Sequence, residues 1–307
     1  MRTYAVVVNW NGGRENLDCI QCLLDEGLTA SEVIFVDNAS ADGSLEDVEA
    51  TYPDITVLRN EKNQGYGHGS NRGIDFALGA GAEAVLLINN DLVLEPGSLS
   101  RLERELVDAP ELGIVGPLVV YKEEPERVWA AGGRLTFRQN LTTLLGHREY
   151  DVPRWQHSAD VDYVPGCAML VRRAVFERVG VLDGDFFAYH EDVDFCMRTS
   201  SAGFGIRLVG EVTARHTSSA ATGGGYSPRR KYMMGVNTIW FLRRHGTPTR
   251  WLRFVIYDVV SLPFVWLVEL ARGRQRGVLA KGLGMVHGAL GRRVTAESIR
   301  PGASRLW

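Results

Sequence analysis

The sequence lacks several features that would assign it to a specialised class. It has no low-complexity tract and no internal repeat, so it is typical of a globular chain and not of a disordered one. Its cysteines are few, and the C-x-x-C pair Cys19 and Cys22 is followed by no second pair or histidine pair at zinc-finger distance. The aromatic and proline context of a thioredoxin-like site is also missing. We therefore expect small core thiols in a reduced, cytoplasmic protein.

Long uninterrupted apolar runs are also missing. The run near the N-terminus is too short for the core of a signal peptide. Residues 254–271 are strongly apolar, but Asp258, Pro263 and Glu269 interrupt them. A spanning helix needs about 20 mostly apolar residues, and a carboxylate in mid-segment is costly there. We predict that this segment lies on a membrane surface or packs on the core, without spanning.

The net charge of −3 conceals an uneven distribution. Residues 243–307 hold twelve Lys and Arg against three Asp and Glu, whereas residues 1–242 hold twenty-two against thirty-four. An acidic body with a basic C-terminal part suggests an anionic partner, and the two candidates are nucleic acid and an anionic membrane surface. Arginines on both sides of the apolar segment suit the membrane interface. The alternative is a solvated basic face on a helical appendage.

The first third of the chain alternates between strand and helix patterns. Apolar runs at 4–9, 32–37, 55–58 and 84–88 are separated by helical patterns at 14–25, 42–51 and 68–80. Runs that are apolar on both faces and separated by helices indicate a mostly parallel sheet covered by helices on both sides. The fold class is therefore α/β.

The rest of the chain is mixed and then helical. Further strands are expected at 113–121, 168–172 and 206–209, and helices at 190–203, 228–245, 250–271 and 275–291. We expect a catalytic body at 1–227, with halves at 1–112 and 113–227, and a helical, basic region at 228–307.

A polar cluster follows each of the first four predicted strands, at 9–13, 37–42, 60–69 and 89–91. In open α/β sheets ligands bind beyond the carboxyl ends of the strands, so these clusters should converge on one crevice. The last cluster, INND, ends in Asp91, which could hold a divalent cation that bridges two phosphates. Asp91 could equally be a turn or cap residue.

The segment HEDVDFCMR at 190–198 carries more acidic residues than a helix start needs. Asp194 and Arg198 are four residues apart and can pair on one helix face. Asp192 is then left over and could act as a general base in a cleft. The competing interpretation is that these carboxylates complement the helix dipole.

Two further clusters could contact a nucleotide. The glycine-rich stretch NQGYGHGSNRG at 63–73 permits close backbone approach, but it lacks G-x-G-x-x-G spacing and follows the third strand, which disfavours a dinucleotide fold. His216 is followed by Thr217, Ser218, Ser219 and several glycines, a composition that suggests a loop able to close over phosphates. A lone histidine is more often structural.

The order of these pieces resembles a known family. VVNWNG, VDNASADGS, NQGYGHGSN, INND, PGCAMLVRR, FFAYHEDVDFCMR and a late histidine are similar to family 2 inverting glycosyltransferases with the GT-A fold. The pattern looks most like bacterial rhamnosyltransferases of cell-surface polysaccharide synthesis, over about residues 3–245. The resemblance implies a GT-A body with a helical C-terminal appendage.

The resemblance also implies residue roles. Asp192 matches the catalytic base, Asp91 and His216 match ligands of Mg²⁺ or Mn²⁺, and Gly166 and Glu191 lie on the acceptor side. Asn89 and Asn90 replace carboxylates of the family's D-x-D motif, which implies a metal held weakly and partly through donor phosphates. The donor-binding set is Asn9, Asn11, Asp37, Asn38, Asn63, Gly65, Asn71, Asn89 and Asn90.

The implied reaction has a nucleoside-diphosphate sugar as donor, best matched by dTDP-L-rhamnose, and a saccharide or polyprenyl-linked saccharide as acceptor. We expect no nucleic-acid partner and peripheral attachment to the inner face of the cell membrane. The C-terminal helices could also form a homo-oligomer. Three other functions stay open. They are transfer from a UDP- or GDP-sugar, nucleotidyl transfer, for which VNWNGGREN lacks the expected Lys, and a catalytically dead glycan-binding homologue.

Overall fold

The computed structural model describes residues 1–138, 140–217 and 226–307. The strands are β1 (Thr3–Asn9), β2 (Val33–Asp37), β3 (Thr56–Arg59), β4 (Ala84–Asn89), β5 (Leu92–Leu94), β6 (Leu112–Tyr121), β7 (Val128–Ala130), β8 (Gly133–Leu135), β9 (Thr142–Leu144), β10 (Ala159–Asp160), β11 (Ala168–Arg172) and β12 (Gly205–His216). The α-helices of the body are α1 (Glu15–Asp25), α2 (Ser44–Thr51), α3 (Tyr66–Gly79), α4 (Ser98–Asp108), α5 (Arg173–Val179) and α6 (Glu191–Ser201).

One large sheet organises the body, with the strand order β10-β12-β6-β11-β4-β1-β2-β3. β1 pairs in parallel with β2 and with β4, and β2 pairs in parallel with β3. β11 is antiparallel to both β4 and β6, between which it lies. The parallel half of the sheet confirms the prediction of parallel strands from runs that are apolar on both faces, because both faces of these strands are buried.

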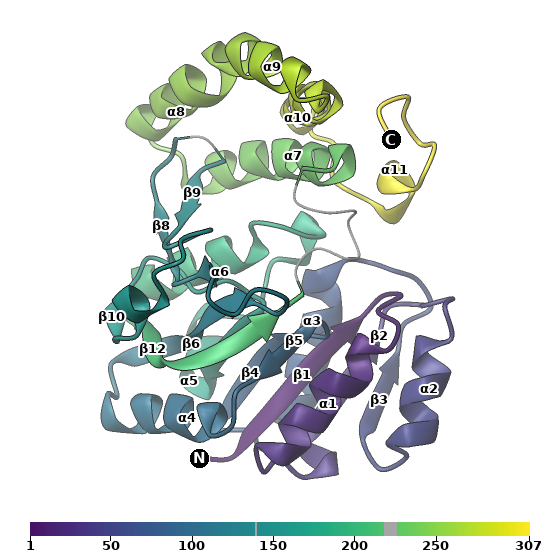
Figure 1. Cartoon of the computed structure of the whole chain (residues 1–307), viewed down its shortest axis with the longest axis vertical. Coiled ribbons are helices and arrows are strands. Elements are labelled where there is room, and N and C mark those ends of the chain that lie inside the picture. Colours follow the sequence, from purple (N-terminus) through teal and green to yellow (C-terminus); the bar gives the residue numbers. More distant parts are fainter. Residues whose placement is uncertain (139, 218–225) are drawn as a thin grey trace.

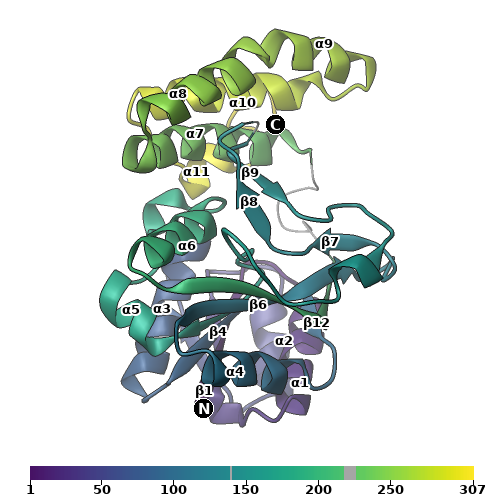
Figure 2. The ribbon, with the colours of Figure 1, turned by 90° about the vertical axis from the view of Figure 1, so that its left-hand side faces the viewer.

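Helices cover the sheet on both sides (Figures 1 and 2). α1, α2 and α4 bury their apolar residues in one core cluster with one face of the sheet, and α3, α5 and α6 do so on the other face. Cys19 and Cys22 are buried in the first cluster and unbonded, as expected of small core residues. The expected start of the third helix at residue 68 is wrong by two residues, because α3 begins at Tyr66.

The glycines of NQGYGHGSNRG serve packing as much as loop geometry. Gly67, Gly69 and Gly73 lie within α3. A Cβ at Gly73 would lie 2.4 Å from the side chain of Val6, and one at Gly69 would lie 2.8 Å from that of Val8. The absence of side chains therefore lets α3 approach the sheet closely.

The C-terminal helices form a separate layer at one end of the body (Figures 1 and 2). They are α7 (Pro228–His245), α8 (Pro248–Phe254), the π-helical turn η4 (Val255–Val260), α9 (Leu262–Ala271), α10 (Gln275–Ala289) and α11 (Ala296–Ile299). Phe241 and Leu242 of α7 belong to the same core cluster as α6. The first helix of this region is therefore packed into the body.

The expected single helix at 250–271 is wrong in one respect, because η4 interrupts it. Pro263 stands in the first turn of α9, and a proline cannot donate the backbone hydrogen bond that a continuous α-helix requires. The segment Pro248–Ala271 is still long and apolar enough to cross a membrane. An 18-residue window within it has a mean hydropathy of 1.8, and only 17% of that window is buried. Core helices of soluble proteins can meet the same length and composition test.

The sequence did not predict several features of the fold, among them the following three. α4 was not anticipated, although Leu99, Leu102 and Leu106 give it a buried stripe. β8 and β9 form a small separate hairpin that rises toward the C-terminal helices (Figure 2). The short strand expected at 206–209 is much longer, because β12 continues past a register shift between Val209 and Thr213 and ends at His216.

Candidate active site

The carboxyl ends of three neighbouring strands meet at one edge of the sheet. Asn9 is the register partner of Asp37, and Val8, just before it, is the partner of Asn89. Asn9 is fully buried, and its Nδ2 donates to Oδ1 of Asp37 at 2.9 Å. The structure therefore brings together the polar clusters that follow β1, β2 and β4.

The turn after β1 is shaped by close contacts with the INND segment. Asn11 adopts a positive φ of 54°, and its Oδ1 accepts a hydrogen bond from the backbone N–H of Ala41 at 2.8 Å. A Cβ at Gly12 would lie 1.9 Å from Nδ2 of Asn90. Only a glycine lets the turn and the strand end approach this closely.

Asn90 uses its amide in a way that a carboxylate could not. Its Nδ2 lies 2.9 Å from Oδ1 of Asn16 and 3.2 Å from Oδ1 of Asn9, and it donates toward both oxygens. An aspartate would place acceptor against acceptor at this position. The departure from an acidic D-x-D motif at residue 90 thus has a local structural reason.

Asp91 and His216 are in direct contact. Nε2 of His216, at the end of β12, lies 3.0 Å from Oδ1 of Asp91, which follows β4. His216 is buried, its ring packs edge-on against Trp129 at a centroid distance of 4.7 Å, and its Nδ1 has no partner within the described residues. Antiparallel pairing of β12 with β5 fixes this arrangement, because His216 is the register partner of Leu92.

The carboxylate and imidazole of this pair fit a weakly held divalent cation. The described part of the chain contains no group of three or more His, Cys, Asp or Glu that could hold a metal by itself. One carboxylate and one imidazole leave most coordination positions to water and to donor phosphates, which is the usual mode for Mg²⁺. Ser218 and Ser219, expected to form a loop over the phosphates, lie outside the described residues.

Asp192 stands in the first turn of α6 and is held by the backbone. Its Oδ2 accepts a hydrogen bond from the N–H of Gly166 at 2.9 Å, and its Oδ1 accepts one from the N–H of Val193 at 2.8 Å. Burial raises the pKa of Asp192, although these two N–H groups oppose the shift. A Cβ at Gly166 would lie only 3.1 Å from that of Asp192.

Glu191, beside it, is in a different environment. The side chain is buried, and its Oε2 has no hydrogen-bond partner within the described residues. Burial, followed by the neighbouring charge of Asp192, raises the pKa of Glu191 well above its usual range. We therefore expect Glu191 to carry a proton under conditions in which Asp192 is ionised.

The loop that leads into α6 is strained and is clamped by α7. Phe187, Tyr189 and His190 all have positive φ values, of 61°, 72° and 76°. Nδ2 of the buried Asn237 lies 2.7, 2.8 and 2.8 Å from the carbonyl oxygens of Phe186, Ala188 and Tyr189. Asn237 thus stabilises the conformation that precedes the acidic pair. The sequence analysis missed this residue, which stands in an ordinary helical pattern.

A buried ion-pair network anchors the same helix. Asp194 is fully buried, and its Oδ2 accepts from Nε of Arg198 at 2.7 Å, which confirms the expected pairing four residues apart. Its Oδ1 lies 2.7 Å from Nε2 of His245 and 3.3 Å from Nη1 of Arg244, both on α7. Because these partners stabilise the ionised form against the cost of burial, the pKa of Asp194 is lowered.

The remaining residues of the expected donor-binding set lie in α3 or beside it, where they form hydrogen bonds with backbone groups. Nδ2 of Asn38 donates to the carbonyl of Gly65 at 3.1 Å, and Oδ1 of Asn63 accepts from the N–H of Gly65 at 2.8 Å. Asn71 makes two hydrogen bonds with the backbone of Leu182, at 2.8 and 3.0 Å. These contacts join α3 to the loop before α6, and nucleotide contact by these side chains stays a prediction.

The chain is similar in sequence to known glycosyltransferases. The family model described as "Glycosyl transferase family 2" matches residues 4–180. The chain is 28% identical over 242 residues to an N-acetylglucosaminyl-diphospho-decaprenol L-rhamnosyltransferase of Mycobacterium tuberculosis, a match that covers 71% of this chain and 78% of the relative. It is 22% identical over 284 residues to the dTDP-rhamnosyl transferase RfbF of Shigella flexneri, covering 85% and 87% of the two chains.

Solved structures share the fold. A mannosyltransferase from Pyrobaculum calidifontis, in complex with GDP-Man and Mn²⁺, superposes with a TM-score of 0.60 at 15% identity over 95% of this chain and 88% of its own. GalNAc-T7, with UDP, GalNAc and Mn²⁺, gives a TM-score of 0.58 at 14% identity over 79% and 49% of the two chains. At these identities the likeness concerns the fold alone.

Proposed function

The chain belongs to glycosyl transferase family 2 and has the GT-A fold, and from this premise we propose that it transfers L-rhamnose from dTDP-L-rhamnose to a hydroxyl of a glycan or lipid-linked saccharide. The rhamnosyl donor is supported by the printed activities of the relatives from Mycobacterium tuberculosis and Shigella flexneri. The acceptor class is supported by the first of them, whose name specifies a decaprenol-linked saccharide.

The observation that carries the mechanism is the setting of Asp192. Two backbone N–H groups fix its carboxylate, and each oxygen keeps a lone pair that can accept a proton. In the proposed reaction the acceptor hydroxyl oxygen attacks the anomeric carbon while the bond to the diphosphate breaks. The hydroxyl proton passes to Asp192, and the configuration inverts in this single displacement.

Asp91 and His216 are the residues that would hold Mg²⁺ or Mn²⁺ in this proposal. When bound, the cation would neutralise charge on the departing diphosphate. The supporting observation is their 3.0 Å contact at the carboxyl edge of the sheet, next to the strand ends that carry Asn9 and Asp37. Both structures described above contain Mn²⁺ together with a nucleotide or nucleotide sugar.

We also propose peripheral attachment to an anionic membrane surface at the inner face of the cell membrane. The helices α8 and α9 expose large apolar side chains, including Leu252, Phe264 and Leu267. Arg250 and Arg253 stand near one end of this face, and Arg272, Arg274 and Arg276 near the other. Apolar burial combined with basic flanks favours a membrane interface.

A transfer assay tests the function. The intact protein is incubated with Mg²⁺, a lipid-linked saccharide and, in parallel, dTDP-L-rhamnose, UDP-sugars or GDP-sugars, and the products are identified by mass spectrometry. We expect a rhamnosylated acceptor and free dTDP. A nucleotide-sugar product would instead indicate nucleotidyl transfer, transfer from UDP- or GDP-sugars would overturn the donor, and no turnover with any donor would indicate a glycan-binding homologue.

A further inference from the structure

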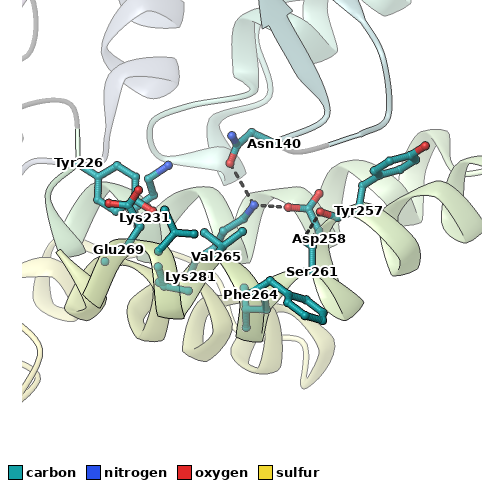
Figure 3. A pocket seen from close by; sticks show the side chains of 14 residues that line it. Asn140, Tyr226, Lys231, Tyr257, Asp258, Ser261, Phe264, Val265, Glu269 and Lys281 are labelled. Carbon is teal, nitrogen blue, oxygen red and sulfur yellow. Dashed lines mark hydrogen bonds and ion pairs between the residues drawn. The ribbon is translucent and has the colours of Figure 1, made fainter. Parts of the chain in front are cut away.

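A cavity of about 480 Å³ lies in the C-terminal layer, outside the proposed active site. It is enclosed by α7, the η4–α9 segment, α10 and the turn of the β8–β9 hairpin, which contributes Asn140 (Figure 3). Its polar lining includes Lys231, Asp258 and Lys281. Its apolar lining is formed by Leu262, Phe264, Val265, Val268 and Val278.

Both carboxylates of this cavity are already neutralised. Lys281 forms an ion pair with Asp258, and its Nζ also donates to Oδ1 of Asn140 at 3.0 Å (Figure 3). Glu269 is bound by Arg272 at 3.0 Å and by Arg274 at 2.6 Å. Each lining carboxylate therefore already has a cationic partner other than Lys231.

Lys231 is the second lysine that lines the cavity. Within the described residues it forms no ion pair, and its ammonium lies 4.4 Å from the centre of the Tyr226 ring. Burial, followed by the positive charges of Lys281 and Arg230, lowers the pKa of Lys231 to about 8. An anion in the cavity would supply the missing counter-charge.

The apolar side of the cavity continues onto the exposed face of α9. Phe264 and Val268 line the cavity and are 69% and 52% exposed. Leu267, next to Val268, is exposed as well. The cavity therefore combines an unpaired cation with an apolar path that leads to the surface, which suits an amphiphile with an anionic head and a hydrocarbon chain.

The cavity shares two elements with the acceptor side of the proposed active site. Lys231 stands on α7, and Oγ1 of Thr238 on the same helix lies 3.3 Å from Nε2 of His190, the residue that precedes Glu191. The hairpin that carries Asn140 also contains Gly133, whose N–H donates to the carbonyl oxygen of Tyr163 at 2.9 Å, three residues before Gly166.

We propose that this cavity binds the diphosphate of a polyprenyl-diphosphate-linked acceptor, with Lys231 as the principal anion ligand and the hydrocarbon chain along the exposed face of α9. The inference rests on the proposed lipid-linked acceptor and assigns the place where its lipid part is held. The saccharide would then extend toward Gly166 and Asp192.

Equilibrium binding of farnesyl diphosphate, a short soluble polyprenyl diphosphate, tests the site in the intact protein. Excess dTDP and Mg²⁺ are present throughout so that the donor cleft is filled. Inorganic diphosphate and farnesol are measured in parallel, because they carry only the anionic or only the apolar half. The variants are Lys231→Gln, the charge-matched control Arg104→Gln on the exposed surface of α4, and Val265→Trp, which fills the cavity.

We expect farnesyl diphosphate to bind more tightly than either half-ligand. Loss of a charge-assisted contact should weaken the binding of farnesyl diphosphate about tenfold in Lys231→Gln, whereas Arg104→Gln should stay within about twofold of the wild type. Val265→Trp should reduce binding as well. Equal affinity of Lys231→Gln and Arg104→Gln for farnesyl diphosphate would overturn the site. Inorganic diphosphate binding as tightly as farnesyl diphosphate would overturn it as well, because that result would indicate a general phosphate site.

The comparison of Lys231→Gln with its control is independent of the donor assignment, because it needs no turnover and both variants leave the donor cleft unchanged. Saturable binding that depends on Lys231, without rhamnosyl transfer, would support the lipid site and reject the donor. Rhamnosyl transfer to a lipid-linked acceptor with no effect of Lys231→Gln on binding would do the reverse. Circular dichroism of each variant verifies that it is folded. If Val265→Trp does not fold, the comparison with Lys231→Gln decides the result.

Discussion

Nδ2 of Asn237 lies 2.8 Å from the carbonyl oxygen of Tyr189, and this contact ties α7 to the strained loop before the proposed catalytic base. The same amide reaches two further carbonyls of that loop, from Phe186 and Ala188. The clamp comes from a helix that the sequence assigned to a C-terminal appendage. The geometry of the loop before the proposed catalytic base therefore depends on packing between the two regions.

Asn237→Ala should lower kcat with little change in KM for the donor, because the loop before Glu191 and Asp192 loses its clamp while the strand ends stay intact. The loop carbonyl oxygens that lose their donor in the folded state should also reduce the free energy of unfolding by about 1–3 kcal/mol. Steady-state kinetics and urea unfolding measure both effects.

Leu106→Ala is the control for this prediction, because Leu106 is fully buried in α4 on the opposite face of the sheet. It should lower stability through a core cavity without lowering kcat at temperatures where the protein is folded. If both variants keep the wild-type kcat, Asn237 has a role in stability only.

Asp192→Asn should reduce kcat by about 10²–10⁴-fold, because the variant loses the proposed general base, while donor affinity stays nearly unchanged. Glu191→Gln should keep much more activity, since we expect Glu191 to be protonated and glutamine resembles the neutral acid. Single-turnover kinetics and donor titration distinguish the two variants. A dead Glu191→Gln beside an active Asp192→Asn would exchange the roles.

The acidic pair should also make stability depend on pH. The pKa values of both carboxyls are raised in the folded state by burial, so their contribution is complete below the unfolded values near 4 and is lost as pH rises through the folded values. Glu191→Gln should therefore gain stability relative to the wild type between pH 5 and pH 8, by on the order of 1 kcal/mol. Urea unfolding at both pH values gives the difference, and a constant difference would refute the shift for Glu191.

Donor binding should require a divalent cation held by Asp91 and His216. Asp91→Asn should abolish turnover and weaken donor binding, and His216→Ala should weaken binding less, since phosphate and water ligands remain. His157→Ala is the matched histidine control, because His157 is exposed on the surface. Calorimetric titration of the donor with Mg²⁺, with Mn²⁺ and with EDTA gives the comparison; unchanged binding in EDTA would reject the metal assignment.

Membrane attachment should depend on the apolar face of α9. The wild type should co-sediment with phosphatidylcholine vesicles that contain phosphatidylglycerol at low salt and be released at high salt, since each basic residue near an anionic surface contributes about 1 kcal/mol. Phe264→Ser combined with Leu267→Ser should abolish binding, and Val107→Ser, at an exposed apolar position of α4, should not. If the wild type stays in the supernatant, the face is better explained as an oligomer interface.

Local patterns in the sequence were sufficient for the framework of the body. The runs at 4–9 and 84–88, which are apolar on both faces, predicted the parallel strands, because burial on both faces selects apolar residues at every position. The four-residue spacing of Asp194 and Arg198 predicted their pairing, because helix geometry alone brings such positions together. The polar strand ends were likewise predicted to converge, and Asn9 and Asp37 do so.

Only the tertiary structure decided which distant side chains meet. The contact between Asp91 and His216 follows from the pairing of β5 with the extended end of β12, and the sequence had indicated a strand that ended much earlier. Asn237 reaches the loop before α6, and Lys231 is left without an ion pair among the described residues, because of how α7 packs on its neighbours. Such contacts depend on the relative placement of whole elements, which no local periodicity encodes.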